Sequence, residues 1–394
     1  MQKEIIKREK YFSQIENFIW KSLVKVFVWL RRVWKSYFLL QIIDYLKQNW
    51  VSEQSIVYVN KENLKFDFIK SYEDLYNFVK NYHYIFVDEI QEIQDWEKAI
   101  RSLIAEWKDV YITGSNSNLL SGELATFLSG RYVSFHIYPL DYKEFLQFHN
   151  LKSEKESFYK YLRYGGLPYL RNLNLNDDVY VYLKDVVNTV VFKDVISRYK
   201  IRNIDFYEKL LNFLAKNIGN ILSAKNIADF LKSQQIKVWV ASVLEYLKYT
   251  QNAFLIDELK RYDLKWKRFF ELKHKFFFED IWIRNAIVWW FDSMDISWLL
   301  ENLVYINLVS NWWKVYVWEY KNYEIDFVCE KWNDKMFIQV AYLLETEQTK
   351  QREFRPLLEL NNSYPKFVLS LDDIAWWNIE GVKHVNLVDF LLEL

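Results

Sequence analysis

Residues 29–36 combine residue types and spacing that point to specific chemistry. They read WLRRVWKS and lie between an apolar segment and a helix-like segment. Phosphate-binding loops have the form G-x-x-x-x-G-K-[ST] between a strand and a helix. Lys35 and Ser36 are in register with this form, but Trp29 and Trp34 stand at its two glycine positions. Because backbone N–H groups must wrap the phosphates and a Cβ atom would intrude, the loop as written is predicted to bind no nucleotide.

A second motif follows about fifty residues later, where Asp88 and Glu89 come directly after the apolar segment 84–87. In nucleotide hydrolases one carboxylate at a strand end holds Mg²⁺, and another group orients the attacking water. We therefore expect Ser36 and Asp88 to hold Mg²⁺ and Glu89 to polarise water. An acidic pair alone is more often a solvated helix cap, and a lysine-serine match alone can be the chance start of a basic helix. Their combination favours a nucleotide site.

Two further polar residues are candidates for contact with phosphate. Asn116 follows the predicted strand 110–113 and the turn Gly114-Ser115, where it could sense the γ-phosphate. Arg131 follows the sequence Leu-Ser-Gly; it either reaches phosphate from a neighbouring subunit or remains a surface arginine.

These side chains need a sheet to bring them together. Short apolar segments alternate with segments that are apolar at helical spacing. The predicted strands are residues 24–28, 56–59, 84–89 and 110–115, and the predicted helices are residues 35–48, 71–81 and 96–107. Nearly all-apolar strands that alternate with helices indicate a buried parallel sheet. We expect residues 1–150 to form an α/β domain of the P-loop NTPase type.

Residues 151–280 are expected to form a helical linker and a winged-helix module. After a turn at 163–170, three short helices precede two strands: residues 206–220, 223–235, 240–251, 253–263 and 267–280. Three helices followed by a hairpin is the winged-helix pattern. The segment 257–275 contains seven Lys and Arg residues and four acidic residues. This bias permits DNA contact, and the alternative is a packing or lid module.

Residues 281–394 are predicted to be a small α/β domain of the restriction-endonuclease-like type. Such nucleases use an Asp, then Glu-x-Lys one strand later, to hold Mg²⁺ and activate water. Asp326 stands in one predicted strand and Glu301 in a predicted helix, but Gln339 and Ala341 replace the Glu and the Lys. We therefore expect a degenerate site without nuclease activity.

Charge and cysteine content exclude several classes of protein. The 394 residues carry 52 Lys and Arg against 52 Asp and Glu, which argues against a wholly polybasic nucleic-acid binder. The single cysteine, Cys329, excludes an intrachain disulfide framework and a cysteine-built zinc site, and it suits a reducing cytosol. No apolar run reaches about 18 residues, and the charged N-terminus lacks a signal-peptide pattern. A cytoplasmic protein without membrane contact is expected.

The sequence resembles the prokaryotic AAA-type (AAA+ superfamily) ATPases that carry a C-terminal domain of unknown function. The resemblance covers nearly the whole chain and includes VFVWLRRVWKSYFLLQII, YIFVDEIQEIQDWEKAIRSL, RYGGLPYL and YEIDFVCE. The loop of that family reads G-x-R-R-x-G-K-S, so Arg31 and Arg32 match as well. The resemblance implies an ATP-binding protein that uses Mg²⁺ and has a poorly defined cellular role. It also implies glycine at positions such as Trp107, Trp282 and Trp298.

Glycine and tryptophan contents are both anomalous. Glycine occurs 7 times and tryptophan 18 times, whereas glycine averages about 7% of residues in proteins. Some bacterial lineages read the UGA codon as glycine, and its other common alternative reading is tryptophan. We hypothesise that most of these tryptophans are glycines in the cell. The alternative is a truly tryptophan-rich, inactive homologue.

Turn positions support this hypothesis independently of the family. Trp332 lies between two predicted strands, Trp50 follows a helix end, and Trp266 lies at the predicted wing tip, all usual places for glycine. Trp96, which opens a helix after Asp95, is expected to be genuine.

Two functions remain open from the sequence. The first is an ATPase in which Lys35 contacts the β- and γ-phosphates and Arg131 is a possible finger acting on a neighbouring subunit. Its partners would be ATP, DNA through the winged helix, and a protein partner or further copies of the chain. The second is a non-enzymatic DNA- or protein-binding module with a blocked nucleotide site. UGA codons at positions 29 and 34 favour the first function, and UGG codons favour the second.

Overall fold

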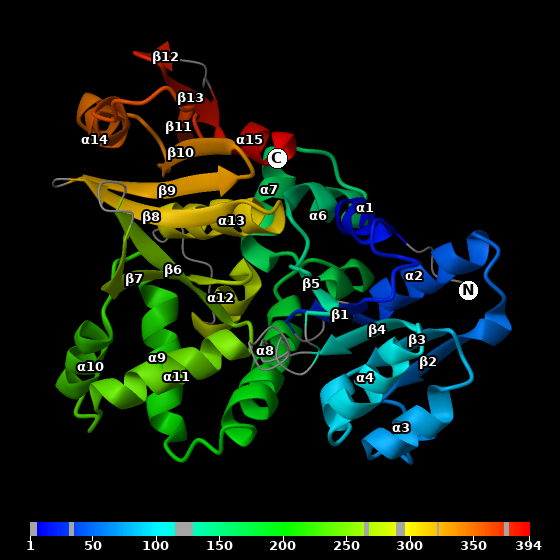
Figure 1. Cartoon of the computed structure of the whole chain (residues 1–394). Helices are drawn as coiled ribbons and strands as arrows, with labels where there is room; N and C mark the ends of the chain where they lie inside the picture. Colours follow the sequence, from blue (N-terminus) through cyan, green and yellow to red (C-terminus); the bar gives the residue numbers. More distant parts are fainter. Residues whose placement is uncertain are drawn as a thin grey trace. The chain divides into compact units, whose positions relative to one another are not determined.

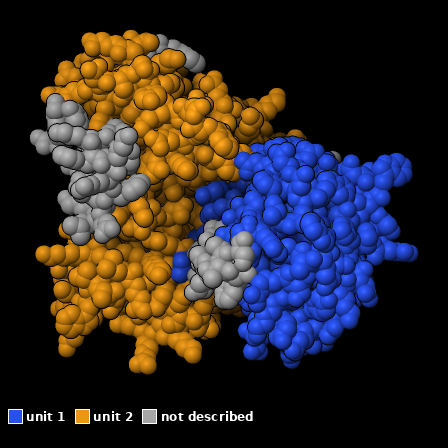
Figure 2. All heavy atoms as spheres, viewed as in Figure 1, with its two compact units in different colours: residues 1–138, 252–254 blue, residues 139–251, 255–394 orange. Residues whose placement is uncertain are grey.

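The computed structural model describes the chain outside residues 1–5, 31–34, 115–127, 129, 264–267, 289–295, 321–322 and 374–377. It also leaves out the side chains of residues 35–36, 261–263, 268–273 and 319–320. The chain forms two compact units (Figure 2). Unit 1 comprises residues 1–138 and 252–254, and unit 2 comprises residues 139–251 and 255–394.

Unit 1 is built on a five-stranded parallel sheet with the strand order β2-β3-β4-β1-β5 (Figure 1). The strands are β1 (Val24–Val28), β2 (Ile56–Asn60), β3 (Tyr84–Asp88), β4 (Asp109–Gly114) and β5 (Tyr132–His136). β1 and β4 are buried along their whole length, as expected of central strands covered on both faces. The predicted parallel α/β sheet is therefore confirmed. The edge strand β5 was missed, because its sequence mixes polar and apolar residues and is less buried.

Helices connect successive strands of this sheet: α2 (Lys35–Gln48), α3 (Tyr72–Val79) and α4 (Trp96–Ala105). A further helix, α1 (Glu9–Glu16), precedes β1. At the start of α3, the Ser71 hydroxyl accepts a hydrogen bond from the Asp74 backbone, and the Asp74 carboxylate accepts one from the Ser71 backbone. This capping box satisfies helix N–H groups that lack a partner within the helix. The three helices predicted from periodicity are all confirmed within a few residues.

The first part of unit 2 is helical. Its elements are α6 (Tyr142–His149), α7 (Lys155–Tyr164), α8 (Val179–Val190), a π-helical segment (Val191–Ser197), α9 (Ile204–Lys216), α10 (Ala224–Ser233) and α11 (Val240–Asn252). The hairpin of β6 (Ile256–Asp263) and β7 (Arg268–Phe278) follows. The predicted order of three helices and a hairpin is present. That this segment works as a winged helix stays a prediction, and the wing tip with Trp266 lies outside the described residues.

The second part of unit 2 contains a mixed sheet of eight strands, in the order β12-β13-β11-β10-β9-β8-β6-β7. Its further strands are β8 (Lys314–Tyr320), β9 (Tyr323–Lys331), β10 (Asp334–Val340), β11 (Lys366–Ser370), β12 (Asn378–Ile379) and β13 (Val382–Asn386). Its helices are α12 (Ile281–Val288), α13 (Ile296–Ser310), α14 (Glu347–Leu358) and α15 (Leu387–Glu393). The hairpin joins this sheet because β6 pairs in parallel with β8. The three-part division at residues 150 and 280 stays a prediction.

Among the residues that the structure describes, five tryptophans have a left-handed backbone. Their φ angles lie between 54° and 68°, at Trp20, Trp50, Trp107, Trp312 and Trp332. This region costs a residue with a Cβ atom roughly 1–2 kcal/mol, and glycine adopts it freely. Three of the five positions were predicted as glycine sites from the sequence: Trp50, Trp107 and Trp332.

Two other tryptophans at which the family resemblance implies glycine lie in helices. Trp282 lies in the first turn of α12 and Trp298 in α13, and neither has a positive φ. Trp282 is fully buried, and its indole N–H has no hydrogen-bond partner in the described part of the chain. Trp96 opens α4 and is buried, as expected of a genuine tryptophan.

Candidate functional site

Asp88 is the last residue of β3 and lies buried among hydroxyl donors. The Thr113 hydroxyl, from the neighbouring strand β4, donates a hydrogen bond to Asp88 Oδ1 at 2.5 Å. The Tyr58 hydroxyl, from β2 on the other side, donates to Asp88 Oδ2 at 3.1 Å. The carboxylate is thus fixed by both neighbouring strands, which holds it in one orientation at the sheet edge.

Glu89 ends the strand in an unusual backbone conformation. Its φ of 57° is left-handed, which is uncommon for a residue other than glycine and is concentrated at functional sites. Its backbone N–H donates to Thr113 Oγ1 at 3.2 Å, and the Gln91 side-chain amide donates to Glu89 Oε2. A short 3₁₀ turn, Ile90–Glu92, follows. Thr113 therefore positions both acidic residues, through the Asp88 side chain and the Glu89 backbone.

Trp29 follows β1 directly and is fully buried. Its indole stacks on the Phe27 ring at 6.3 Å between centroids and meets the Phe38 ring edge-on at 6.3 Å. The indole N–H has no hydrogen-bond partner among the described residues, and a buried unsatisfied donor costs about 1–3 kcal/mol. The Trp29 side chain is thus packed into the interior of unit 1 against two aromatic rings.

The rest of the predicted loop is only partly described. Arg31, Arg32 and Trp34 lie outside the described residues, as does Asn116. Lys35 and Ser36 begin α2, and only their backbone is described. The predicted start of a helix at the lysine-serine pair is confirmed.

Strand register shows which predicted residues meet. Val28 pairs with Gly114, and Val87 pairs with Ile112. Because the strands are parallel, the loop start after Val28 and the pair Asp88–Glu89 lie at the same carboxyl edge of the sheet. Arg131 does not join them: it precedes β5 and accepts a hydrogen bond on its carbonyl from the Val24 N–H, at the opposite edge.

Sequence analysis missed Thr113 and Tyr58 as parts of this site. Thr113 is buried near the end of β4, and Tyr58 is half-buried in the middle of β2. A buried hydroxyl needs a hydrogen-bond partner, so Thr113 at the end of the mostly apolar segment 110–113 was a usable signal. Its partner, Asp88, could be identified only once the strand order was known.

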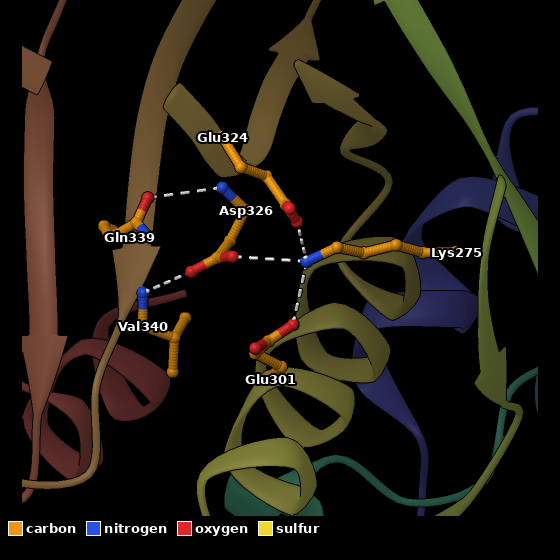
Figure 3. A network of polar contacts seen from close by, with 6 residues as sticks. All are labelled: Lys275, Glu301, Glu324, Asp326, Gln339 and Val340. Atoms are coloured by element: carbon orange, nitrogen blue, oxygen red, sulfur yellow. Dashed lines mark hydrogen bonds and ion pairs between the residues drawn. The ribbon is translucent and has the colours of Figure 1, made fainter. Parts of the chain in front are cut away.

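A second polar cluster lies in unit 2 and contains the predicted degenerate nuclease residues (Figure 3). Asp326 on β9 accepts a hydrogen bond from the Val340 N–H at 2.9 Å, and Gln339 on β10 accepts one from the Asp326 N–H at 3.3 Å. Glu301 reaches the cluster from α13. Ala341, beside Gln339 and Val340, is buried and offers no functional group.

Lys275 on β7 is the unpredicted member of this cluster. Its ammonium lies 3.0 Å from Glu301 and 3.2 Å from Asp326. Burial alone would lower the pKa of Lys275, but the surrounding carboxylates hold it well above its ordinary value. Burial raises the pKa of Glu301 to about 8, against the lowering effect of Lys275. The Lys275 ammonium is therefore charged.

Family comparisons agree with the architecture. Residues 22–146 match the family described as an AAA domain, and residues 155–293 match a domain of unknown function (DUF8612). An uncharacterized protein of Haemophilus influenzae is 31% identical over 100% of both chains. The uncharacterized protein MJ1544 of Methanocaldococcus jannaschii is 33% identical over 98% of this chain and 89% of its own length.

Two solved structures resemble this chain in part, each with a TM-score below 0.5. The Walker-type ATPase PABY2304 of Pyrococcus abyssi is 15% identical, covers 73% of this chain and 97% of its own, and has a TM-score of 0.49. DnaA from Aquifex aeolicus, bound to AMPPCP, is 13% identical, covers 63% and 89%, and has a TM-score of 0.33.

The parallel sheet and the match of residues 22–146 to an AAA domain identify the N-terminal part of the chain as an α/β domain of the AAA type. The chain belongs to the same family as the two full-length relatives from Haemophilus influenzae and Methanocaldococcus jannaschii. Among the described residues, no helix has both the length and the apolar character needed to cross a membrane.

Proposed function

We propose that the protein is an Mg²⁺-dependent ATPase with glycine at positions 29 and 34 in the cell. The observation that carries the proposal is the pair Asp88–Glu89. It stands at the carboxyl edge of the parallel sheet, the same edge at which β1 leads toward the lysine-serine loop; β4 lies between the two strands. Carboxylate oxygens are the ligands that Mg²⁺ prefers, so this pair fits a nucleotide-bound metal ion. The indole of Trp29 does not fit the phosphates.

Each residue has a distinct proposed role. The backbone at 29–34, with Arg31 and Arg32, wraps the phosphates, and Lys35 neutralises the β- and γ-phosphate charge. Ser36 and Asp88 hold Mg²⁺. Glu89 orients the attacking water, and Asn116 senses the γ-phosphate. These are the roles that such residues have in P-loop ATPases.

Arg131 can serve the site only from another copy of the chain. Within one chain it lies at the edge of the sheet opposite to Asp88. We therefore keep the trans-acting role as part of the proposal, which implies a homo-oligomer. DNA contact through α9–α11 and the β6–β7 hairpin is a further part, supported by the basic bias of the hairpin sequence.

The backbone conformation and burial of several tryptophans support the hypothesis that they are encoded by UGA and are glycine in the cell. In the described part of the chain, five tryptophans have the left-handed φ that favours glycine. Two others, Trp29 and Trp282, are fully buried with an indole N–H that lacks a hydrogen-bond partner within the described residues. Buried tryptophans normally find a partner for this group. Strained turns and unsatisfied indoles are both expected where glycine has been written as tryptophan.

The codons at positions 29 and 34 give the first test. UGA at both positions agrees with the proposal, and mass spectrometry of those peptides from the native host reads the residues directly. UGG codons, or tryptophan in the native peptides, would contradict the recoding.

Hydrolysis by a glycine-restored protein gives the functional test. The variant Trp29→Gly/Trp34→Gly is expected to hydrolyse Mg-ATP. Adding Glu89→Gln should stop hydrolysis while ATP binding persists, because the metal ligand Asp88 remains. Normal hydrolysis by the Glu89→Gln protein would show that Glu89 is not the base.

A further inference from the structure

The ammonium of Lys275 lies at the centre of three carboxylates (Figure 3). Its Nζ atom is 2.5 Å from Glu324 Oε1, 3.0 Å from Glu301 Oε2 and 3.2 Å from Asp326 Oδ1. A lysine ammonium has three N–H donors, so one donor is available for each carboxylate. The Lys275 side chain is 2% exposed. All of its charge is therefore compensated inside the protein rather than by solvent.

Separate elements bring these groups together. Lys275 extends from β7, Glu324 and Asp326 from β9, and Glu301 from α13. The Asp326 carboxylate is oriented by its hydrogen bond from the Val340 N–H. The fold thus converges three acidic side chains on one point.

Gly219 leaves room for the Glu301 carboxylate in this cluster. Gly219 has a φ of +72°, and a Cβ atom there would lie 2.6 Å from Glu301 Oε2. A residue with a Cβ atom at position 219 would require the Glu301 carboxylate to shift from this place. The close approach is therefore part of how the cluster is built.

Three converging carboxylates need a cation. Negatively charged carboxylates that converge on one point repel one another, and their oxygens are the ligands that Mg²⁺ and Mn²⁺ prefer. Glu301 and Asp326 also line a cavity of about 440 Å³, together with Gln339, Arg352 and Glu353. Solvent and ions thus have a path to two of the three carboxylates.

We propose that Lys275 is a built-in cation: its ammonium occupies the place of a divalent metal ion and makes this cluster independent of metal. Within the described residues, no set of three His, Cys, Asp or Glu side chains is spaced to hold a metal ion as it stands. A divalent ion would draw the oxygens in to about 2.1 Å, closer than they lie to Nζ. Lys275 therefore both neutralises the cluster and keeps metal out.

Removing the ammonium should turn the cluster into a metal site. Lys275→Ala is expected to bind Mn²⁺ at least tenfold more tightly than the wild-type chain in nucleotide-free titration calorimetry. Its melting temperature should rise on adding Mn²⁺ and fall again in EDTA. Lys335→Ala is the matched control, since Lys335 also belongs to this sheet and pairs with the Glu330 carboxylate at 2.7 Å. It should show no gain in Mn²⁺ binding.

A double variant locates the new site. Lys275→Ala/Asp326→Asn should lose the gained affinity, which distinguishes this cluster from a weak site near Asp88. The proposal is overturned if Lys275→Ala binds Mn²⁺ no better than wild type. It is equally overturned if that variant stays unfolded both with and without Mn²⁺, because the ion should then have replaced the ammonium.

Discussion

Replacing Trp332 by glycine should stabilise the protein. Trp332 and Asn333 form the two-residue connection between β9 and β10, whose ends pair through Lys331 and Asp334. The φ of Trp332 is 54°, and a positive φ at the first central residue of such a hairpin favours glycine. The indole is 94% exposed, so its removal sacrifices little packing.

The expected magnitude follows from two opposing effects. Relief of the left-handed conformation is worth roughly 1–2 kcal/mol. The greater freedom of glycine in the unfolded chain removes about 0.4–1 kcal/mol of that gain. We therefore expect Trp332→Gly to raise the free energy of unfolding by about 0.5–1 kcal/mol, measured by urea denaturation with both proteins sharing the same slope.

Trp96 provides the matched comparison. It is buried at the start of α4, so Trp96→Gly should lower the free energy of unfolding by about 3–5 kcal/mol through loss of packing. If Trp332→Gly were destabilising by more than about 0.5 kcal/mol, the reasoning that links left-handed tryptophans to glycine positions would be refuted.

The remaining predictions concern charge and chemistry. Lys25→Met should lower the free energy of unfolding by about 3–5 kcal/mol, because it leaves Asp109, the buried partner of Lys25, without its counter-charge. Chemical denaturation that follows the unfolding of unit 1 measures this loss, and an unchanged midpoint would contradict the prediction. Burial raises the pKa of Glu301 from 4.5 to about 8, so the contribution of Glu301 to stability is complete below pH about 4.5 and is lost as the pH rises through 8. Glu301→Gln should therefore flatten the fall in melting temperature between pH 5 and 8. An unaltered pH profile of the melting temperature would count against a raised pKa of Glu301. The protein should not nick plasmid or single-stranded DNA with Mg²⁺ or Mn²⁺, with or without ATP, because Gln339 is a poor metal ligand; cleavage that disappears in Asp326→Ala would overturn this expectation.

Much of the architecture could be predicted from local sequence. The segments 24–28 and 84–88 are short and almost wholly apolar, so a buried parallel sheet was the only arrangement that hides both faces. Parallel strands share a carboxyl edge, so the sheet placed Asp88 and Glu89 at the same edge as the end of β1. β5 escaped prediction because an edge strand with polar residues carries no such signal.

Long-range contacts limited the prediction of both clusters. Lys275 was counted as one of several basic hairpin residues, yet it is a buried ammonium whose partners lie 26 to 51 positions later in the chain. No spacing rule connects β7, β9 and α13. Thr113 likewise became meaningful only when β3 and β4 proved to be neighbours. Arg131 is a residue type suited to phosphate contact, but it lies at the edge of the sheet opposite to Asp88. It is therefore not placed to act on the Asp88 site within one chain.

Mg-ATP binding by the glycine-restored protein tests the central claim most directly. Isothermal titration should show saturable Mg-ATP binding to Trp29→Gly/Trp34→Gly, and no binding either to the chain as written or to the restored protein with Lys35→Ala. At 100 times the dissociation constant, binding should also add about 2.7 kcal/mol to stability, which gives an independent thermal readout. Absence of binding to the restored protein, or equal binding to the chain with both tryptophans, would contradict the assignment of residues 29–36 as a nucleotide loop blocked by Trp29 and Trp34.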